Sequence, residues 1–182
     1  KAPKFPIIVI AGDLLDIAGH VDLDTQILVV KRYLKKLSET SVVLVCSGNH
    51  DGDHKNEDDE YVAEWLEGLL NENVYGDTMN YETEGWTFTM CPWWDGPVTR
   101  SVVAAFLESK AAKEYDSWFL IYHAPPSGAK TSWSGKRTIG DELLETFITD
   151  HQPEIVLSGH IHNAPFRDGG AWADRIGQTW VF

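Results

Sequence analysis

Four short, mostly apolar runs divide the chain at residues 6–11, 42–46, 117–122 and 154–157. Each contains consecutive apolar residues, many of them β-branched, rather than an alternation with polar ones. Such runs are typical of strands buried on both faces of a sheet. The pattern therefore predicts a sheet core made of these segments.

Between these runs, apolar positions recur at helical spacing. Ile27, Val30 and Leu34 share one face of a predicted helix over residues 24–37. Further helices are predicted over residues 58–70, 101–115 and 141–150, with the acidic residues 57–60 in the first turn of the second helix. Two hairpins are expected, over residues 81–91 and 171–182.

Carboxylate, amide or imidazole side chains follow each of the four predicted strands. They are Asp13, Asn49, His50, His123, His160 and His162. Because strands that alternate with helices bring their carboxyl ends to one edge of a sheet, these side chains are expected to converge. Oxygen and imidazole ligands without a thiolate suit Zn, Fe, Mn or Ni.

Length, charge and cysteine content narrow the class of protein. The 182 residues indicate a single domain over residues 1–182. A net charge of −13 argues against a broad nucleic-acid surface, and no apolar run approaches the ~18 residues of a membrane span. Cys46 and Cys91 lie in apolar runs, so we expect two buried thiols and a cytoplasmic location. Nothing in the sequence indicates an oligomeric state.

The strand-end motifs resemble the signature of the calcineurin-like metallophosphoesterase family. That signature runs GDxxD, GNHD, a lone His and GHxH, and this chain has Gly12 to Asp16, Gly48 to Asp51, His123, and Gly159 to His162 in the same order. The resemblance implies an α/β fold of α+β type, a two-sheet β sandwich flanked by helices. It also implies a dinuclear centre of two divalent or trivalent ions (Mn, Fe, Zn or Ni). That centre would activate water to hydrolyse a phosphomonoester or phosphodiester.

The same resemblance assigns roles to individual residues. Asp13 would bridge the two ions. Asn49, His123 and His160 would complete the ligands of one ion, and His162 would bind the other. His50 would lie beside the substrate phosphate as a catalytic residue, with Asp51 orienting its ring. Asp16 would hold the strand-end loop without touching metal. For both Asp51 and Asp16 simple turn chemistry beside a glycine is the alternative.

The sequence departs from the family pattern at its beginning. The family's D-x-H block should precede GDxxD, yet the first eleven residues contain neither Asp nor His. Two explanations stay open. The chain lacks its N-terminal strand–helix unit, or it is a natural variant with a damaged first metal site. Such a variant would bind one metal or act as a non-catalytic scaffold for protein partners.

Residues near the motifs suggest substrate contacts as well. His54 follows the GNHD block, and Trp133 and Arg137 lie in the long loop over residues 124–140. Long loops in compact domains are often functional, so these residues are candidates for binding a small-molecule phosphate ester. Trp93 and Trp94 could stack on an aryl group or simply pack a loop onto the domain.

Overall fold

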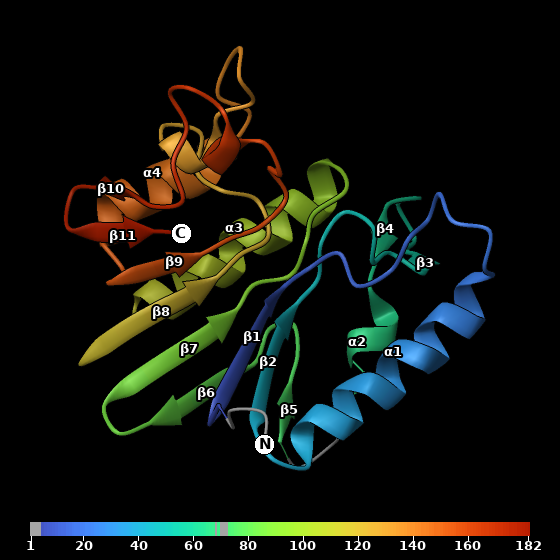
Figure 1. Ribbon diagram of the computed structural model, residues 1–182. Coiled ribbons are helices and arrows are strands. Elements are labelled where there is room, and N and C mark those ends of the chain that lie inside the picture. Colours follow the sequence, from blue (N-terminus) through green and yellow to red (C-terminus); the bar gives the residue numbers. More distant parts are fainter. Residues whose placement is uncertain (1–4, 68, 70–72) are drawn as a thin grey trace.

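The computed structural model describes residues 5–67, 69 and 73–182. Two sheets pack face to face, and helices cover the outer face of each (Figure 1). This arrangement confirms the expected α/β fold with two sheets flanked by helices.

The smaller sheet has the strand order β1-β2-β5 and is parallel. Its strands are β1 (Ile7–Ala11), β2 (Val42–Cys46) and β5 (Val74–Tyr75). Ala11 is opposite Cys46 in the register, so the loops that follow β1 and β2 begin side by side.

The larger sheet has the order β10-β11-β9-β8-β7-β6. Its strands are β6 (Asn80–Thr83), β7 (Trp86–Met90), β8 (Ser117–Ile121), β9 (Ile155–Leu157), β10 (Asp174–Ile176) and β11 (Thr179–Val181). The inner strands are parallel, and an antiparallel hairpin closes each edge. Both hairpins were predicted.

Alternate residues of each inner strand enter different core layers, as a side-chain period of two requires. In β2, Leu44 and Cys46 face the larger sheet, whereas Val43 and Val45 pack beneath α1 (Leu23–Ser38) and α2 (Glu64–Glu67). The outer face of the larger sheet is covered by α3 (Pro97–Ala111) and α4 (Glu142–His151). Among the described residues, no helix combines the length and apolar character needed to cross a membrane.

The helix predicted over residues 58–70 is wrong. This segment contains the short strand β4 (Tyr61–Val62), which pairs with β3 (His54–Lys55), and only the single turn of α2. The Asn56 side chain explains the difference, because its Oδ1 accepts the amide protons of Asp58 and Glu60 and folds the acidic run into a turn. Residues 68 and 70 of the predicted helix lie outside the described residues.

Glu60 has a different role from the one predicted. Its buried carboxylate accepts the amide protons of Val98 and Thr99 at 2.8 and 2.6 Å. It therefore caps α3, which begins at Pro97 rather than at residue 101 as predicted.

Candidate metal centre

The site lies where β1, β2, β8 and β9 end, near the centre of the view in Figure 1. The chain turns sharply at two of these ends. Asp13 and His160 have positive φ values of 58° and 63°, which non-glycine residues seldom adopt. Such strain is concentrated at functional sites and directs both side chains to one point.

Four of the predicted metal ligands meet at this point. Asn49 Oδ1 lies 2.8 Å from His160 Nδ1 and 3.1 Å from His123 Nε2. Asp13 Oδ2 lies 3.2 Å from the same His123 nitrogen. The ligand atoms of Asp13, His123 and His160 all lie within 4.8 Å of one another.

The protons of this cluster show why it suits a cation. His123 Nδ1 lies 2.5 Å from the Ala11 carbonyl oxygen, which can only accept a hydrogen bond, so Nδ1 carries the proton. Nε2 is then the ring atom that faces Asp13 Oδ2 and Asn49 Oδ1, and once deprotonated it can bind a metal ion together with these two oxygens. One imidazole nitrogen and two oxygens that converge in this way fit a metal ion, whose positive charge would take the place of the proton on Nε2.

Electrostatics favour the metal-binding form of two members of the cluster, Asp13 and His160. Burial alone would raise the pKa of Asp13, but the hydrogen bond and positive charge of His123 and the His50 amide together lower it. Burial, with the charge of the neighbouring His123, lowers the pKa of His160. An ionised Asp13 and a neutral His160 are both competent ligands.

Two glycines leave the space that the ligands occupy. A Cβ atom at Gly12 would overlap the His123 ring, and one at Gly48 would overlap the Asp13 carboxylate. Gly12 also has a φ of 82°. Both glycines therefore leave room for ligand side chains and do more than permit a backbone turn.

Of the two roles left open for Asp51, its contacts match the holding of turns rather than the orienting of His50. Its buried carboxylate accepts four backbone N–H groups, from Asp13, Leu14, Leu15 and Gly48, at 2.7 to 3.0 Å. The His50 ring is not among its partners in the described part of the chain. Asp51 therefore joins the loop after β1 to the loop after β2 instead of orienting His50.

His50 nevertheless lies beside the cluster. Its backbone N–H donates to Asp13 Oδ1 at 3.0 Å, and its charge contributes to lowering the pKa of Asp13. The bond occupies the Asp13 oxygen that does not face His123.

Trp93 and Trp94 form an aromatic wall on one side of the cluster. Their rings stack with centroids 5.7 Å apart, and the Trp93 ring lies 5.5 Å from both the His123 and His160 rings. The Trp93 amide donates to Ser47 Oγ at 2.7 Å, directly after β2. The sequence left open whether these residues stack on an aryl group or pack their loop onto the domain, and the contacts seen here are packing contacts.

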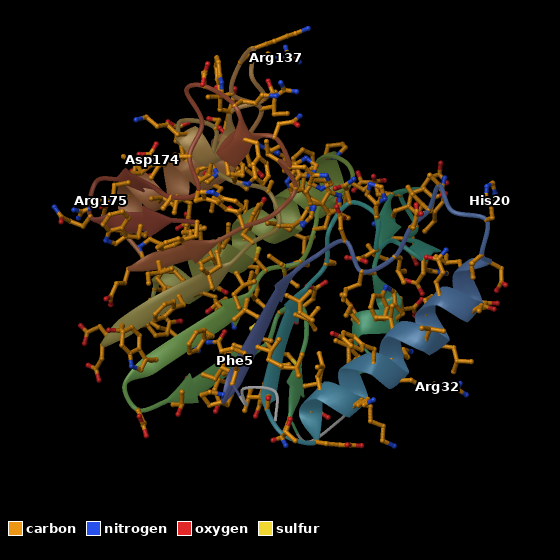
Figure 2. The ribbon with its side chains drawn as sticks, in the orientation of Figure 1. Phe5, His20, Arg32, Arg137, Asp174 and Arg175 are labelled. Atoms are coloured by element: carbon orange, nitrogen blue, oxygen red, sulfur yellow. The ribbon has the colours of Figure 1, made fainter. Side chains whose placement is uncertain are left out.

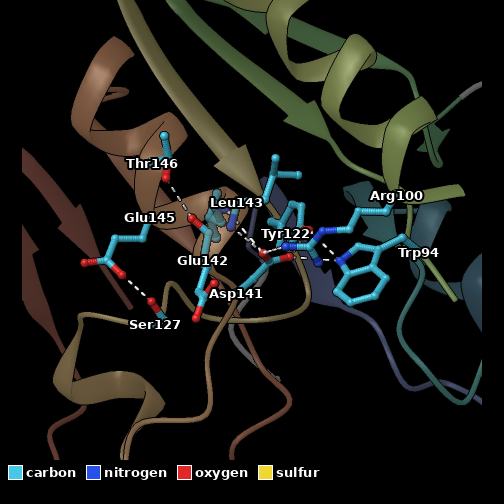
Figure 3. Close-up of polar contacts among 10 residues, drawn as sticks. Trp94, Arg100, Tyr122, Ser127, Asp141, Glu142, Leu143, Glu145 and Thr146 are labelled. Carbon is cyan, nitrogen blue, oxygen red and sulfur yellow. Dashed lines mark hydrogen bonds and ion pairs between the residues drawn. The ribbon is translucent and has the colours of Figure 1, made fainter. Parts of the chain in front are cut away.

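The buried carboxylate of Asp141 holds this wall in place. The sequence predicted Asp141 only as the start of a helix. Asp141 accepts hydrogen bonds from Trp94 Nε1 at 2.8 Å and from Tyr122 at 2.5 Å, and pairs with Arg100 at 3.1 Å (Figure 3). The Arg100 guanidinium also lies over the Trp94 ring, 4.1 Å from its centroid. The partners come from separate elements, so no local sequence signal could have predicted this network.

A pocket of about 430 Å³ opens from the cluster and is lined by Asp13, His123, His160 and His162. His162 is exposed at its rim, close enough for its charge to affect the pKa of His160. Phe166 and Trp172, which are 75% and 69% exposed, form an edge-to-face pair on the same pocket.

Other predicted residues lie away from the cluster. Asp16 caps its own turn by accepting the Ala18 amide at 3.0 Å. His54 is exposed and pairs with Glu64. The Trp133 indole donates to the Asp168 carbonyl at 2.9 Å. Arg137 lies at the outer tip of its loop (Figure 2), so the structure does not bring these last three to the site.

The fold and the cluster define a class of protein, a two-sheet metallophosphoesterase-type domain with Asp, Asn and His side chains converging at the strand ends. Comparison with known proteins agrees. The model of the family described as calcineurin-like phosphoesterase matches residues 1–164. The chain therefore belongs to this family.

Solved structures show the same fold at low sequence identity. TT1561 of Thermus thermophilus is 15% identical, with a TM-score of 0.63 over 97% of this chain and 75% of that one. Another crystal structure is 14% identical, with a TM-score of 0.62 over 97% of this chain and 78% of that one. A comparison with curated protein sequences finds no match.

Proposed function

We propose that this protein hydrolyses a small-molecule phosphate ester with a metal ion bound by Asp13, Asn49, His123 and His160. Family membership supports metal-dependent phosphoester hydrolysis in general. The observation that carries the proposal is the convergence of Asp13 Oδ2, Asn49 Oδ1 and His123 Nε2, whose ring holds its other nitrogen against the Ala11 carbonyl.

The metal, when bound, supplies Lewis acidity that promotes ionisation of water and offsets charge on the phosphoryl oxygens. The side chains and backbone of the protein would supply the ligands, their orientation and the proton donor. Ionised Asp13 provides the negative charge of the ligand set, and the Ala11 carbonyl fixes the tautomer of His123. His50, next to Asn49, is our candidate for protonating the departing oxygen.

We also propose that a second metal ion binds next to the first. Asp13 and His162 line the same pocket, and His162 is exposed and free to approach an ion there. Two protein ligands predict weaker binding than four. We therefore expect a tight first ion and a loosely held second one, of Mn, Fe, Zn or Ni. We also propose a cytoplasmic location, because Cys46 and Cys91 are buried free thiols.

The test combines metal analysis with hydrolysis. The purified protein, loaded with Mn or Zn, is expected to retain at least one equivalent after desalting and to hydrolyse 4-nitrophenyl phosphate or its bis ester. His123→Ala should lose both the tight equivalent and the activity. His20→Ala, which replaces an exposed histidine, is the matched control. This variant should keep both the tight metal equivalent and the activity.

Two results would contradict the proposal. Activity in His123→Ala at full metal loading would show that this cluster is not the catalytic one. Absence of a tight metal together with no hydrolysis of either ester would instead favour a protein-binding scaffold on the same fold.

A further inference from the structure

A second pocket, whose lining does not include His162, adjoins the metal cluster. It encloses about 540 Å³, and Asn49 and Trp93 form part of its wall. Asn49 contacts both cluster histidines, and the Trp93 ring packs against them. The cluster and this side pocket therefore share a wall.

The rest of the side pocket is apolar or acidic. Ile17, Val21 and Tyr61 contribute large side chains that are 61%, 54% and 48% exposed. The charged lining residues are Asp16 and Asp95, each with one oxygen bonded to a backbone amide. No Lys, Arg or His is among the described residues that line it.

The loop that carries Ile17 and Val21 is held in a defined conformation. Gln26, on α1, accepts the Asp16 amide proton at 2.7 Å and donates to the carbonyl groups of Asp16 and Val21 at 3.0 and 2.8 Å. One side chain thus fixes both ends of the loop. A pocket with a fixed wall binds a ligand without a large ordering cost.

We propose that the side pocket receives the leaving group of the phosphate ester and selects an uncharged aryl or bulky alkyl alcohol. This inference rests on the proposed function, because it places the phosphoryl group at the metal cluster. The Trp93 and Tyr61 rings offer aromatic contact for such a group. The two carboxylates repel leaving groups that carry phosphate or carboxylate, in a chain whose net charge is already −13.

Binding of a leaving group by itself tests the pocket independently of catalysis. The probe is 4-fluorophenol, followed by fluorine NMR with the unmodified protein. Val21→Asp should weaken its binding about tenfold, since a third carboxylate enters the pocket. Val102→Asp, the same change on α3 at a similar exposure of 59%, should leave binding unchanged.

Rates of hydrolysis then test whether the side pocket discriminates between leaving groups. The ratio of kcat/KM for phenyl phosphate to that for methyl phosphate should fall about tenfold in Val21→Asp and stay constant in Val102→Asp. Phenyl phosphate should also be preferred to 4-carboxyphenyl phosphate by at least about tenfold.

The outcomes separate the two proposals. Hydrolysis without 4-fluorophenol binding, or with an unchanged ratio in Val21→Asp, would overturn the side-pocket assignment and leave the proposed function intact. Binding of 4-fluorophenol without hydrolysis of any ester would contradict the proposed function but not the pocket. Binding of a second protein copy that blocks 4-fluorophenol would identify the patch as an interface instead.

Discussion

Asp51, Asp77 and Asp141 are buried carboxylates that fix loops around the site without being among the converging ligands. Asp51 gathers four backbone amides, and Asp141 gathers Trp94, Tyr122 and Arg100. Asp77 accepts the Ser47 amide at 2.8 Å, and Ser47 in turn accepts the Trp93 amide. Each carboxylate connects segments far apart in sequence, so replacing one should affect distant parts of the site.

Asp77 makes stability depend on pH. Burial raises the pKa of Asp77 from 3.8 to about 7 in the folded protein. Folding therefore takes up a proton between these two values, and stability falls as the pH rises from about 4 to about 7. At about 1.4 kcal/mol per pKa unit, the cost above pH 7 is on the order of 4 kcal/mol.

Asp77→Asn should remove this cost while keeping an acceptor for Ser47. Its gain in unfolding free energy over the parent protein, measured by urea denaturation, should be much larger at pH 8 than at pH 5. An equal gain at both pH values would mean that Asp77 does not titrate between them.

The helices depend on residues outside themselves for their first turns. Glu60 caps α3 from the loop before β4, and Asp141 both caps α4 and holds Trp94. These contacts explain why α3 begins earlier than the apolar spacing predicted. They also couple the helix starts to the aromatic wall beside the cluster.

Asp141→Ala should be strongly destabilising for this reason. It leaves the Arg100 guanidinium, the Trp94 indole and the Tyr122 hydroxyl without their shared partner and removes the cap of α4. We expect a loss of roughly 3 kcal/mol or more in unfolding free energy.

Asp22→Ala is the comparison, because Asp22 caps the exposed start of α1 through Thr25. Thermal and urea denaturation should show a clearly smaller loss for it. Equal losses would indicate that the network around Asp141 adds nothing beyond helix capping.

On the scale of the whole molecule, the cluster joins the two sheets. Asp13 and Asn49 follow strands of the smaller sheet, and His123 and His160 follow strands of the larger one. A metal bound here would cross-link the two halves of the sandwich. Its binding energy would therefore stabilise the fold as a whole.

Chelation should accordingly lower the melting temperature. A metal at 100 times its Kd adds about 2.7 kcal/mol, which corresponds to about 5–10 °C in a domain of this size. Differential scanning fluorimetry with and without a chelator measures the shift. His160→Ala should lose the shift and His20→Ala should retain it. A shift preserved in His160→Ala would place the metal elsewhere.

The sequence by itself determined the four buried strands, the two hairpins and the polar residues that follow each buried strand, but not the short strands β3, β4 and β5. Those features depend on local periodicity and on motif order, which a single chain displays directly. The prediction failed between residues 56 and 67, where the Asn56 turn and the capping of α3 by Glu60 decide the structure.

The tertiary structure alone decided how the site is held. Asp51 binds backbone amides rather than His50, Asp141 holds the aromatic wall, and Gln26 fixes the loop of the side pocket. Each depends on which segments the packing of the two sheets brings together. Contacts between residues distant in the chain have no local periodicity, so their partners became evident only in the folded molecule.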